Sequence, residues 1–311
     1  MFTRGFYTEH MSKVPSLLRL PIVVNTPHRD VVTSSPLLLF DPNKMYSQTE
    51  VASWFAMATA FTPPLKGSLG EVRKLEVRRL HADGITQTPF TLAIKRMELQ
   101  HNGREDEILQ EESRHLRMYT ALSEHQRRRC LRFFTEPFQV GKSSKRGADG
   151  VEVIYTLQEW ATQGVESILE FKSILQPAPH SFVSSDQLEE LNSLTTAQVH
   201  RWLQTVATLL GRALRCIVDA GFYLKDLNAR NVLLCFRGTV AAPVGVRLVI
   251  IDLASLDRIE APDAFQMGEM TGVLTHIDVR FGEMSQEFFH DFLDWLQASY
   301  DRPNDESNDP I

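Results

Sequence analysis

Cysteine is scarce in this chain: Cys130, Cys216 and Cys235 are the only three among 311 residues. They stand far apart, and no two of them form a CxxC pair. A disulfide framework or a zinc site normally needs more cysteines, or closer ones. The sequence therefore predicts neither, and it favours a reducing intracellular compartment. The cytoplasm is the first expectation, with the nucleus or an organelle left open.

Long apolar runs are also missing. The run "VRLVIIDLA" at 246–254 has the length of one buried strand, so no membrane span is expected. The N-terminus "MFTRGFYTEHMSKVPSLLRL" lacks a continuous apolar core followed by small residues, which excludes a secretory signal. Its scarcity of acids leaves an organelle transit peptide open.

A basic excess is lacking as well, because the net charge is -6. This balance argues against a protein that mainly grips nucleic acid, so no nucleic-acid partner is expected. The local basic runs at 125–134 and 141–146 are interpreted as solvated loop ends. With 43% hydrophobic and 23% charged residues, the composition is that of an ordinary globular protein.

The periodicity of the chain predicts an α+β fold in which strands dominate before about residue 160 and helices follow. The expected parts are an N-terminal extension (1–62), a β-rich lobe (63–160), a helical lobe (161–300) and a flexible polar tail (301–311). The expected strands are 71–80, 90–99, 131–141, 151–160 and 246–252. The expected helices are 105–122, 285–300 and a long one from Thr195–Thr196 to a cap at Gly221.

One polar stretch interrupts this pattern: "YLKDLNARNVLL", from Tyr223 to Leu234. It places Asp226, Asn228, Arg230 and Asn231 within six residues, directly before a buried strand. Taken alone, such a segment could be a polar turn that joins a helix to a strand.

Two other features suggest phosphate chemistry. The segment "GSLGEV" at 67–72 carries two glycines in a hairpin, where backbone N–H groups can approach a phosphate closely. Lys95 stands within the apolar strand "LAIK", where it could meet a phosphate if a carboxylate on the next helix holds it. Glu112 is the preferred partner because its i+4 neighbour is the apolar Leu116, and Glu111 is the alternative.

The ordered set "GSLGEV", "LAIK", a helix with Glu112, "LKDLNARNVLL" and "IIDLAS" resembles the protein kinase-like superfamily over about residues 63–260. The resemblance implies a bilobal protein kinase-like fold with a β-rich N-lobe and a truncated helical C-lobe. It also implies ATP and Mg²⁺ as cofactors.

The resemblance assigns roles to individual residues. Lys95 would pair with the ATP phosphates and Glu112 with Lys95. Asp226 would accept the proton of the substrate hydroxyl, and Arg230 would help to seat the substrate. Asn231 and Asp252 would bind the metal. The residues expected to contact the nucleotide are Gly67, Ser68, Gly70, Val72, Ala93, Lys95, Gln158, Glu159, Trp160 and Leu233.

The chain also departs from the family. Leu65 replaces the first glycine of the phosphate loop, Leu224-Lys225 replaces the His-Arg pair before Asp226, and Leu253-Ala254 follows Asp252 in place of Phe-Gly. No Ala-Pro-Glu-like anchor follows. Asn231 and Asp252 stand 21 positions apart, farther than is usual in the family.

The expected function is therefore that of an atypical kinase, an ATP- and Mg²⁺-dependent phosphotransferase acting on a hydroxyl acceptor. A protein Ser/Thr acceptor is preferred. The alternatives are a pseudokinase that serves as a binding or scaffold module, and a kinase of sugars or other small molecules, such as those of lipopolysaccharide.

Overall fold

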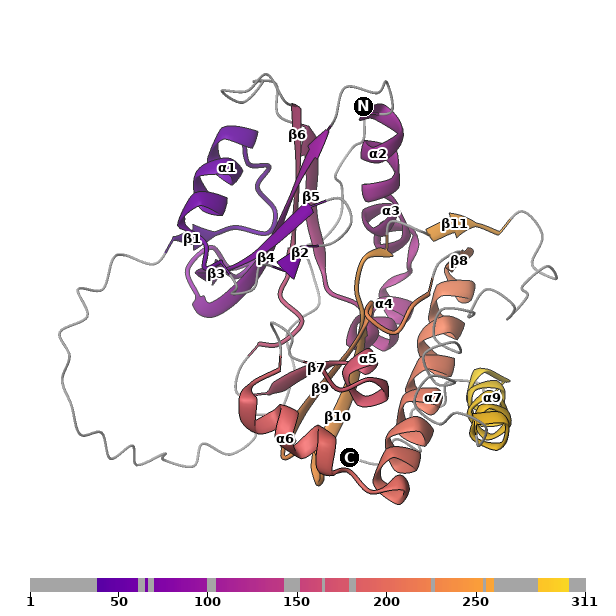
Figure 1. The fold of residues 1–311 in the computed structure, drawn as a ribbon. Helices are drawn as coiled ribbons and strands as arrows, with labels where there is room; N and C mark the ends of the chain where they lie inside the picture. The colour runs from indigo at the N-terminus through magenta and orange to yellow at the C-terminus, as the bar shows by residue number, and fades with distance from the viewer. Residues whose placement is uncertain are drawn as a thin grey trace, which may run out of the picture. The chain divides into compact units, whose positions relative to one another are not determined.

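The computed structural model describes residues 38–60, 65–66, 70–99, 105–142, 152–163, 166–178, 183–224, 227–253, 256–259 and 285–301. Internal contacts divide the chain into two compact units. The first consists of Met1–Asn43 and Glu76–Phe90, and the second of Lys44–Leu75 and Thr91–Ile311. The α+β class expected from the sequence is confirmed by the order of strands and helices along the chain (Figure 1).

The first unit is a small β structure. The short strand β1 (Leu39–Phe40) pairs in parallel with the end of β3 (Gly70–Leu80). The rings of Phe40 and Phe90 stack at 6.2 Å between centroids. In the loop that follows β3, Gly84 has a φ of +69°, a conformation that residues other than glycine rarely adopt.

The second unit begins with the larger sheet. Its strands follow the order β3-β4-β6-β5, and β2 (Leu65–Lys66) pairs with β3 as an antiparallel hairpin. In chain order, the other strands are β4 (Gln87–Leu99), β5 (Pro137–Lys142) and β6 (Glu152–Glu159). The predicted pairing between the strands at 131–141 and 151–160 is confirmed for β5 and β6.

A helix from the segment expected to be an N-terminal extension covers part of this sheet. The helix α1 (Gln48–Met57) begins at Ser47, whose side chain and that of Glu50 form a reciprocal capping box. Phe55 of α1 contacts Tyr155 of β6, with 6.0 Å between ring centroids. The buried amide of Gln139 exchanges two hydrogen bonds with the backbone of Tyr46, at 2.9 and 2.7 Å.

The prediction of a helix over 105–122 was wrong in one respect: the chain forms two helices there instead of one. These are α2 (Glu105–Glu112) and α3 (Arg114–Ala121). At the junction, the Ser113 hydroxyl donates to the Leu109 carbonyl at 2.6 Å, a back-bond that often bends helices. The helix α4 (Glu124–Cys130) and a 3-10 turn (Leu131–Phe133) then lead into β5.

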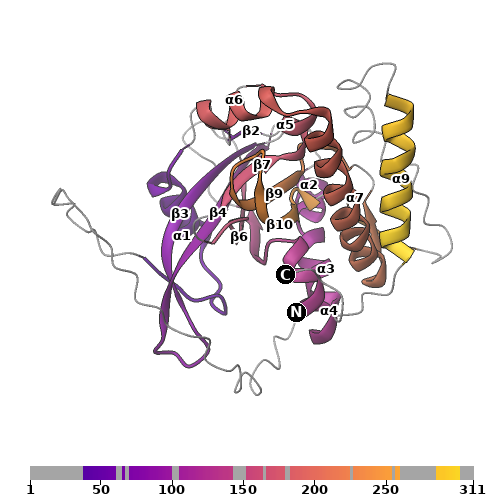
Figure 2. The same cartoon turned by 90° about the horizontal axis from the view of Figure 1, so that it is seen from below.

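The long helix predicted after Thr195 is confirmed as α7 (Thr196–Asp219). Thr195 and Gln198 form its capping box, and Gly221 follows it with a φ of +83°. The apolar residues along one face of α7 are buried, with Leu209 only partly so. The helix α9 (Ser285–Asp301) runs alongside α7, as Figures 1 and 2 show. The approach is close, since a Cβ on Gly211 would meet the Leu296 carbonyl.

The expectation that helices dominate after residue 160 was incomplete. The helices α5 (Phe171–Leu175) and α6 (Ser185–Ser193) are present, but so is a three-stranded sheet. It consists of β7 (Ser167–Glu170), β9 (Val232–Gly238) and β10 (Pro243–Ile250). The strand β7 has four residues, too few for a two-residue alternation to stand out.

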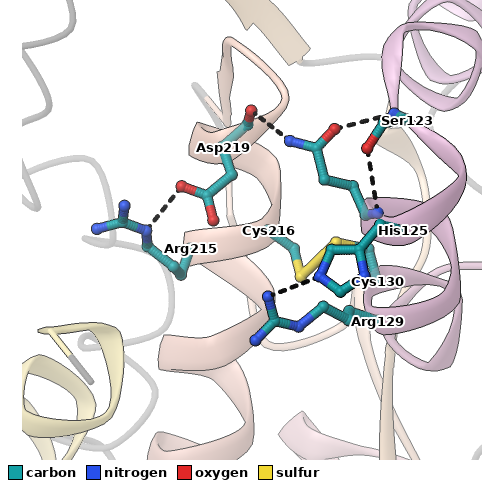
Figure 3. The surroundings of a disulfide bond; sticks show 8 residues. Ser123, His125, Arg129, Cys130, Arg215, Cys216 and Asp219 are labelled. Carbon is teal, nitrogen blue, oxygen red and sulfur yellow. Dashed lines mark hydrogen bonds and ion pairs between the residues drawn. A yellow bond between two sulfur atoms is a disulfide. The ribbon is translucent and has the colours of Figure 1, made fainter. Parts of the chain in front are cut away.

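The prediction of no disulfide was wrong. Cys130 at the end of α4 and Cys216 in α7 form a disulfide, with 5.7 Å between their Cα atoms (Figure 3). Folding brings these two residues together across a separation of 86 positions. Structural disulfides persist mainly in oxidising compartments. The cysteine pattern therefore no longer supports a reducing compartment. Among the described residues, no helix combines the length and hydropathy needed to cross a membrane.

Candidate active site

The centre of the site is an ion-paired lysine. Lys95 lies in the middle of β4, and its Nζ is 2.8 Å from Glu112 Oε1 and 3.1 Å from Asp252 Oδ1. The structure thus pairs Lys95 with Glu112 rather than with Glu111. The side chains of Lys95 and Glu112 are only 16% and 9% exposed. Burial opposes the charged form of Lys95, but the two carboxylates outweigh it and raise the pKa of this lysine.

Asp252 has an unusual backbone. Its φ of +56° makes it the one described residue other than glycine in the left-handed region. Such a conformation costs free energy, and residues that adopt it cluster at functional sites. Its side chain is 47% exposed, so the carboxylate that contacts Lys95 also remains open to solvent.

Backbone contacts connect Asp252 to the polar stretch that precedes β9. The N–H of Ile251, the residue before Asp252, donates to the Asn231 carbonyl at 2.8 Å. In addition, β8 (Phe222–Leu224), which precedes the polar stretch, pairs with β11 (Leu256–Arg258), which follows Asp252. Two leucines near the site, Leu224 and Leu253, are both buried in the main hydrophobic cluster.

Three of the predicted site residues, Gly67, Ser68 and Asp226, lie outside the described residues. The part of the loop that is described makes a compact turn. The Asn228 side chain accepts from the Arg230 N–H at 2.8 Å, and the Asn231 N–H donates to the Asn228 carbonyl at 3.0 Å. Arg230 is exposed, as a residue that meets a substrate must be.

The residues expected beside the nucleobase come from both sheets of the second unit. Ala93 of β4 and Gln158 of β6 are direct cross-strand partners. Ala93, Trp160 and Leu233 are buried, whereas Val72, Gln158 and Glu159 are partly exposed. Gly70 has a packing role of its own, because a Cβ there would meet the Arg96 carbonyl of β4.

Sequence reasoning missed a role for His115. This α3 residue is buried, and its Nε2 has no hydrogen-bond partner among the described residues. Burial lowers the pKa of His115 to about 4, although polar groups of Thr135 and Gln158 oppose that shift. The imidazole is therefore neutral at physiological pH. The only sequence signal was its place on the inward face of the predicted helix.

A second missed residue is Glu170, at the end of β7. Burial raises the pKa of Glu170 to about 7, while the charges of Arg230 and Lys172 act in the opposite direction. The Lys172 backbone N–H donates to the Ala229 carbonyl at 3.0 Å. This bond connects the segment that carries Glu170 and Lys172 to the polar loop. No sequence motif marks it, because β7 itself was not predicted.

No protein-family model matches the chain, and no curated protein matches it. Solved structures similar to it include "WaaP in complex with acyl carrier protein", with a TM-score of 0.40 and 14% identity, covering 80% of this chain and 87% of that one. Another is "Crystal structure of BubR1 kinase domain", with a TM-score of 0.36 and 10% identity, covering 65% of this chain and 47% of that one.

Proposed function

We propose that the chain is an atypical kinase, which uses ATP and Mg²⁺ to phosphorylate a hydroxyl acceptor. The observation that carries this proposal is the position of Lys95 Nζ, between Glu112 at 2.8 Å and Asp252 at 3.1 Å. With Glu112 and Asp252 each accepting one hydrogen bond from Lys95, one of its three N–H groups is left for an anionic ligand. An exposed second carboxylate beside that lysine suits a cation that accompanies such a ligand.

The residues fit Mg²⁺ by the chemistry of their donors. Asp252 offers a half-exposed carboxylate, and Asn231 offers an amide on a segment bonded to the residue before Asp252. Mg²⁺ prefers oxygen ligands and is usually bound by one or two side chains together with substrate phosphates. When bound, the ion neutralises charge on those phosphates.

The chain's own residues then act by position and charge. Lys95 binds phosphate oxygens. Asp226 takes the proton of the acceptor hydroxyl, whose oxygen forms a bond to the γ-phosphorus as the bond to the bridging β–γ oxygen breaks. ADP leaves with that oxygen. Arg230 helps to seat the acceptor, for which a protein Ser/Thr hydroxyl is preferred over a small molecule.

The nucleotide would contact the residues that the resemblance assigned to it. The phosphate side consists of Gly67, Ser68 and Gly70. The base side consists of Val72, Ala93, Gln158, Glu159, Trp160 and Leu233. Ala93 and Leu233 are buried apolar residues, and Val72 is partly exposed, which fits the mostly apolar lining of a nucleobase site.

Turnover of Mg·ATP with candidate acceptors tests this function. Asp226→Asn should leave nucleotide affinity nearly intact and lower kcat by roughly 10²–10⁴-fold, the range for losing general acid–base help. Asp252→Asn should weaken both metal-dependent nucleotide binding and turnover. Glu112→Gln should lower turnover, whereas Glu111→Gln, its matched control, should not.

A scaffold module predicts another pattern, with no turnover in any form of the protein. If Asp226→Asn turns over as fast as the wild type, the assignment of the catalytic loop is wrong.

A further inference from the structure

The connecting segment, residues 160–163, follows β6 and is fixed on one side by β4. The Trp160 N–H donates to the Thr91 carbonyl at 2.9 Å. The Gln163 side chain continues this pairing: its amide oxygen accepts from the Thr91 N–H at 2.9 Å, and its amide nitrogen donates to the Thr91 carbonyl at 2.8 Å. The Gln163 side chain thus serves as a hydrogen-bond partner for both backbone groups of Thr91, in the place of a further strand residue.

On its other side, the connecting segment is fixed by two donors that share one carbonyl. The Ala161 oxygen accepts from Arg247 Nη2 at 2.6 Å and from the Cys235 thiol at 3.8 Å. Ala161 is 6% exposed, so water does not readily replace these donors. Burial raises the pKa of Cys235 to about 12, and the thiol therefore keeps its proton at neutral pH.

The two donors meet because of the register of the β9–β10 hairpin. Cys235 and Arg247 are direct cross-strand partners, and such partners project from the same face of a sheet. The register shifts between Val244 and Arg247, around Gly245 with its φ of +62°. This irregularity brings Arg247 opposite Cys235. The hairpin lies in the long interval between Asn231 and Asp252. The residues of that interval therefore form the strands that place Arg247 beside Ala161.

The guanidinium is itself oriented. Glu166 Oε2 lies 3.1 Å from Arg247 Nη2, and the two side chains are 23% and 33% exposed. A hydrogen bond from a guanidinium to a carbonyl is stronger than one between neutral groups. Ala161 also shares a small core cluster with Leu233, the residue expected against the base. The contact from Arg247 thus fixes the Ala161 backbone beside Leu233.

We propose that Arg247 is a positioning residue for the nucleobase: it sets the orientation of the Ala161 peptide in the connecting segment and so shapes the edge that the base meets. This inference rests on the proposed function, and it adds a residue on the β9–β10 hairpin to the nucleotide site. Arg247 acts through Ala161 and does not itself touch the nucleotide.

The test compares two ligands that differ in the base. Affinities of Mg·ATP and of Mg·tripolyphosphate are measured by calorimetry for the wild type and for Arg247→Met. We expect Arg247→Met to weaken Mg·ATP binding roughly 10-fold, as expected for a lost charged hydrogen bond, and to leave tripolyphosphate binding unchanged. In turnover assays, KM for ATP should rise while kcat stays within about threefold.

Two further variants complete the design. Arg237→Met removes an exposed arginine from the same hairpin and should change neither affinity. Arg247→Lys keeps the charge and one donor, so it should restore part of the loss. If Arg247→Met does not fold, as judged by circular dichroism, Arg247→Lys is compared with the wild type for the same two ligands.

An unchanged ratio of the two affinities in Arg247→Met, or in Arg247→Lys if the methionine variant does not fold, would overturn the inference, whether both ligands weaken or neither does. A wild-type protein that binds neither ligand would instead contradict the proposed function. The two failures are therefore distinguishable.

Discussion

At the scale of single residues, the site consists of side chains in environments that cost free energy. Lys95 and Glu112 are charged groups with little exposure, and burial of an unpaired charge is costly. Asp252 adopts a left-handed backbone that favours glycine. Both features bring charged groups together, which is the arrangement that a phosphate and a cation require.

His115 provides a prediction about pH. Its pKa is about 4 in the native state, against an ordinary value of 6.5. Between these values the unfolded chain binds a proton that the native protein does not, so stability falls as pH falls from 6.5 to 4. This residue should contribute roughly 3 kcal/mol to that loss, by the conversion of pKa shifts into free energy.

The measurement is urea unfolding at pH 7 and pH 4.5 for the wild type, His115→Phe and the exposed-site control His125→Gln. Carboxylates titrate in this range too, so the quantity of interest is the difference between variants. His115→Phe should show the smaller pH-dependent loss, and His125→Gln should behave as the wild type does. Equal losses in all three proteins would show that His115 does not set this dependence.

At the scale of secondary-structure elements, α4 is joined to α7 by two contacts. The Cys130–Cys216 disulfide is one, and a 3.1 Å hydrogen bond from the Gln126 side chain to the Asp219 carbonyl is the other (Figure 3). Because α3 immediately precedes α4 in the chain, this attachment also restrains the end of the helix that carries His115.

The disulfide predicts a stability that depends on redox conditions. Removing it with Cys130→Ala/Cys216→Ala should lower the free energy of unfolding by about 2–4 kcal/mol, because the unfolded chain is no longer cross-linked across a long loop. Denaturant unfolding with and without a reductant measures this. The reductant should destabilise the wild type and Cys235→Ala, and leave the double variant unchanged. If the reductant does not change the free energy of unfolding of the wild type, the prediction is wrong.

At the scale of the whole molecule, the proposed function predicts coupling between ligand and global stability. A nucleotide that binds only the native state should add about 2.7 kcal/mol of stability at a concentration of 100 times its Kd. Thermal unfolding of the wild type should therefore shift upward by several degrees with Mg·ATP.

Two lysine variants make this test specific. Lys95→Met should lose most of the shift, because it removes the proposed phosphate contact, whereas Lys44→Met, at an exposed position, should keep it. If millimolar Mg·ATP shifts no form of the protein, the chain does not bind a nucleotide and the proposed function fails.

The sequence by itself determined features that depend on neighbours within a few positions. The helix α7 was predicted with its start at Thr195–Thr196 and its stop at Gly221, because helix caps are local. The preference for Glu112 over Glu111 as the partner of Lys95 also rested on near neighbours in the sequence, whereas the contact between β4 and α2 itself is a feature of the tertiary structure.

Only the tertiary structure decided the contacts between distant segments. Cys130 meets Cys216, and Arg247 meets Ala161, each across 86 positions of sequence. Such contacts depend on strand register and helix packing, which no short window of sequence contains. A one-residue change of register in the β9–β10 hairpin would direct Arg247 to the opposite face. For this reason the sequence shows the length of the interval before Asp252, but it does not predict the contact between Arg247 and Ala161.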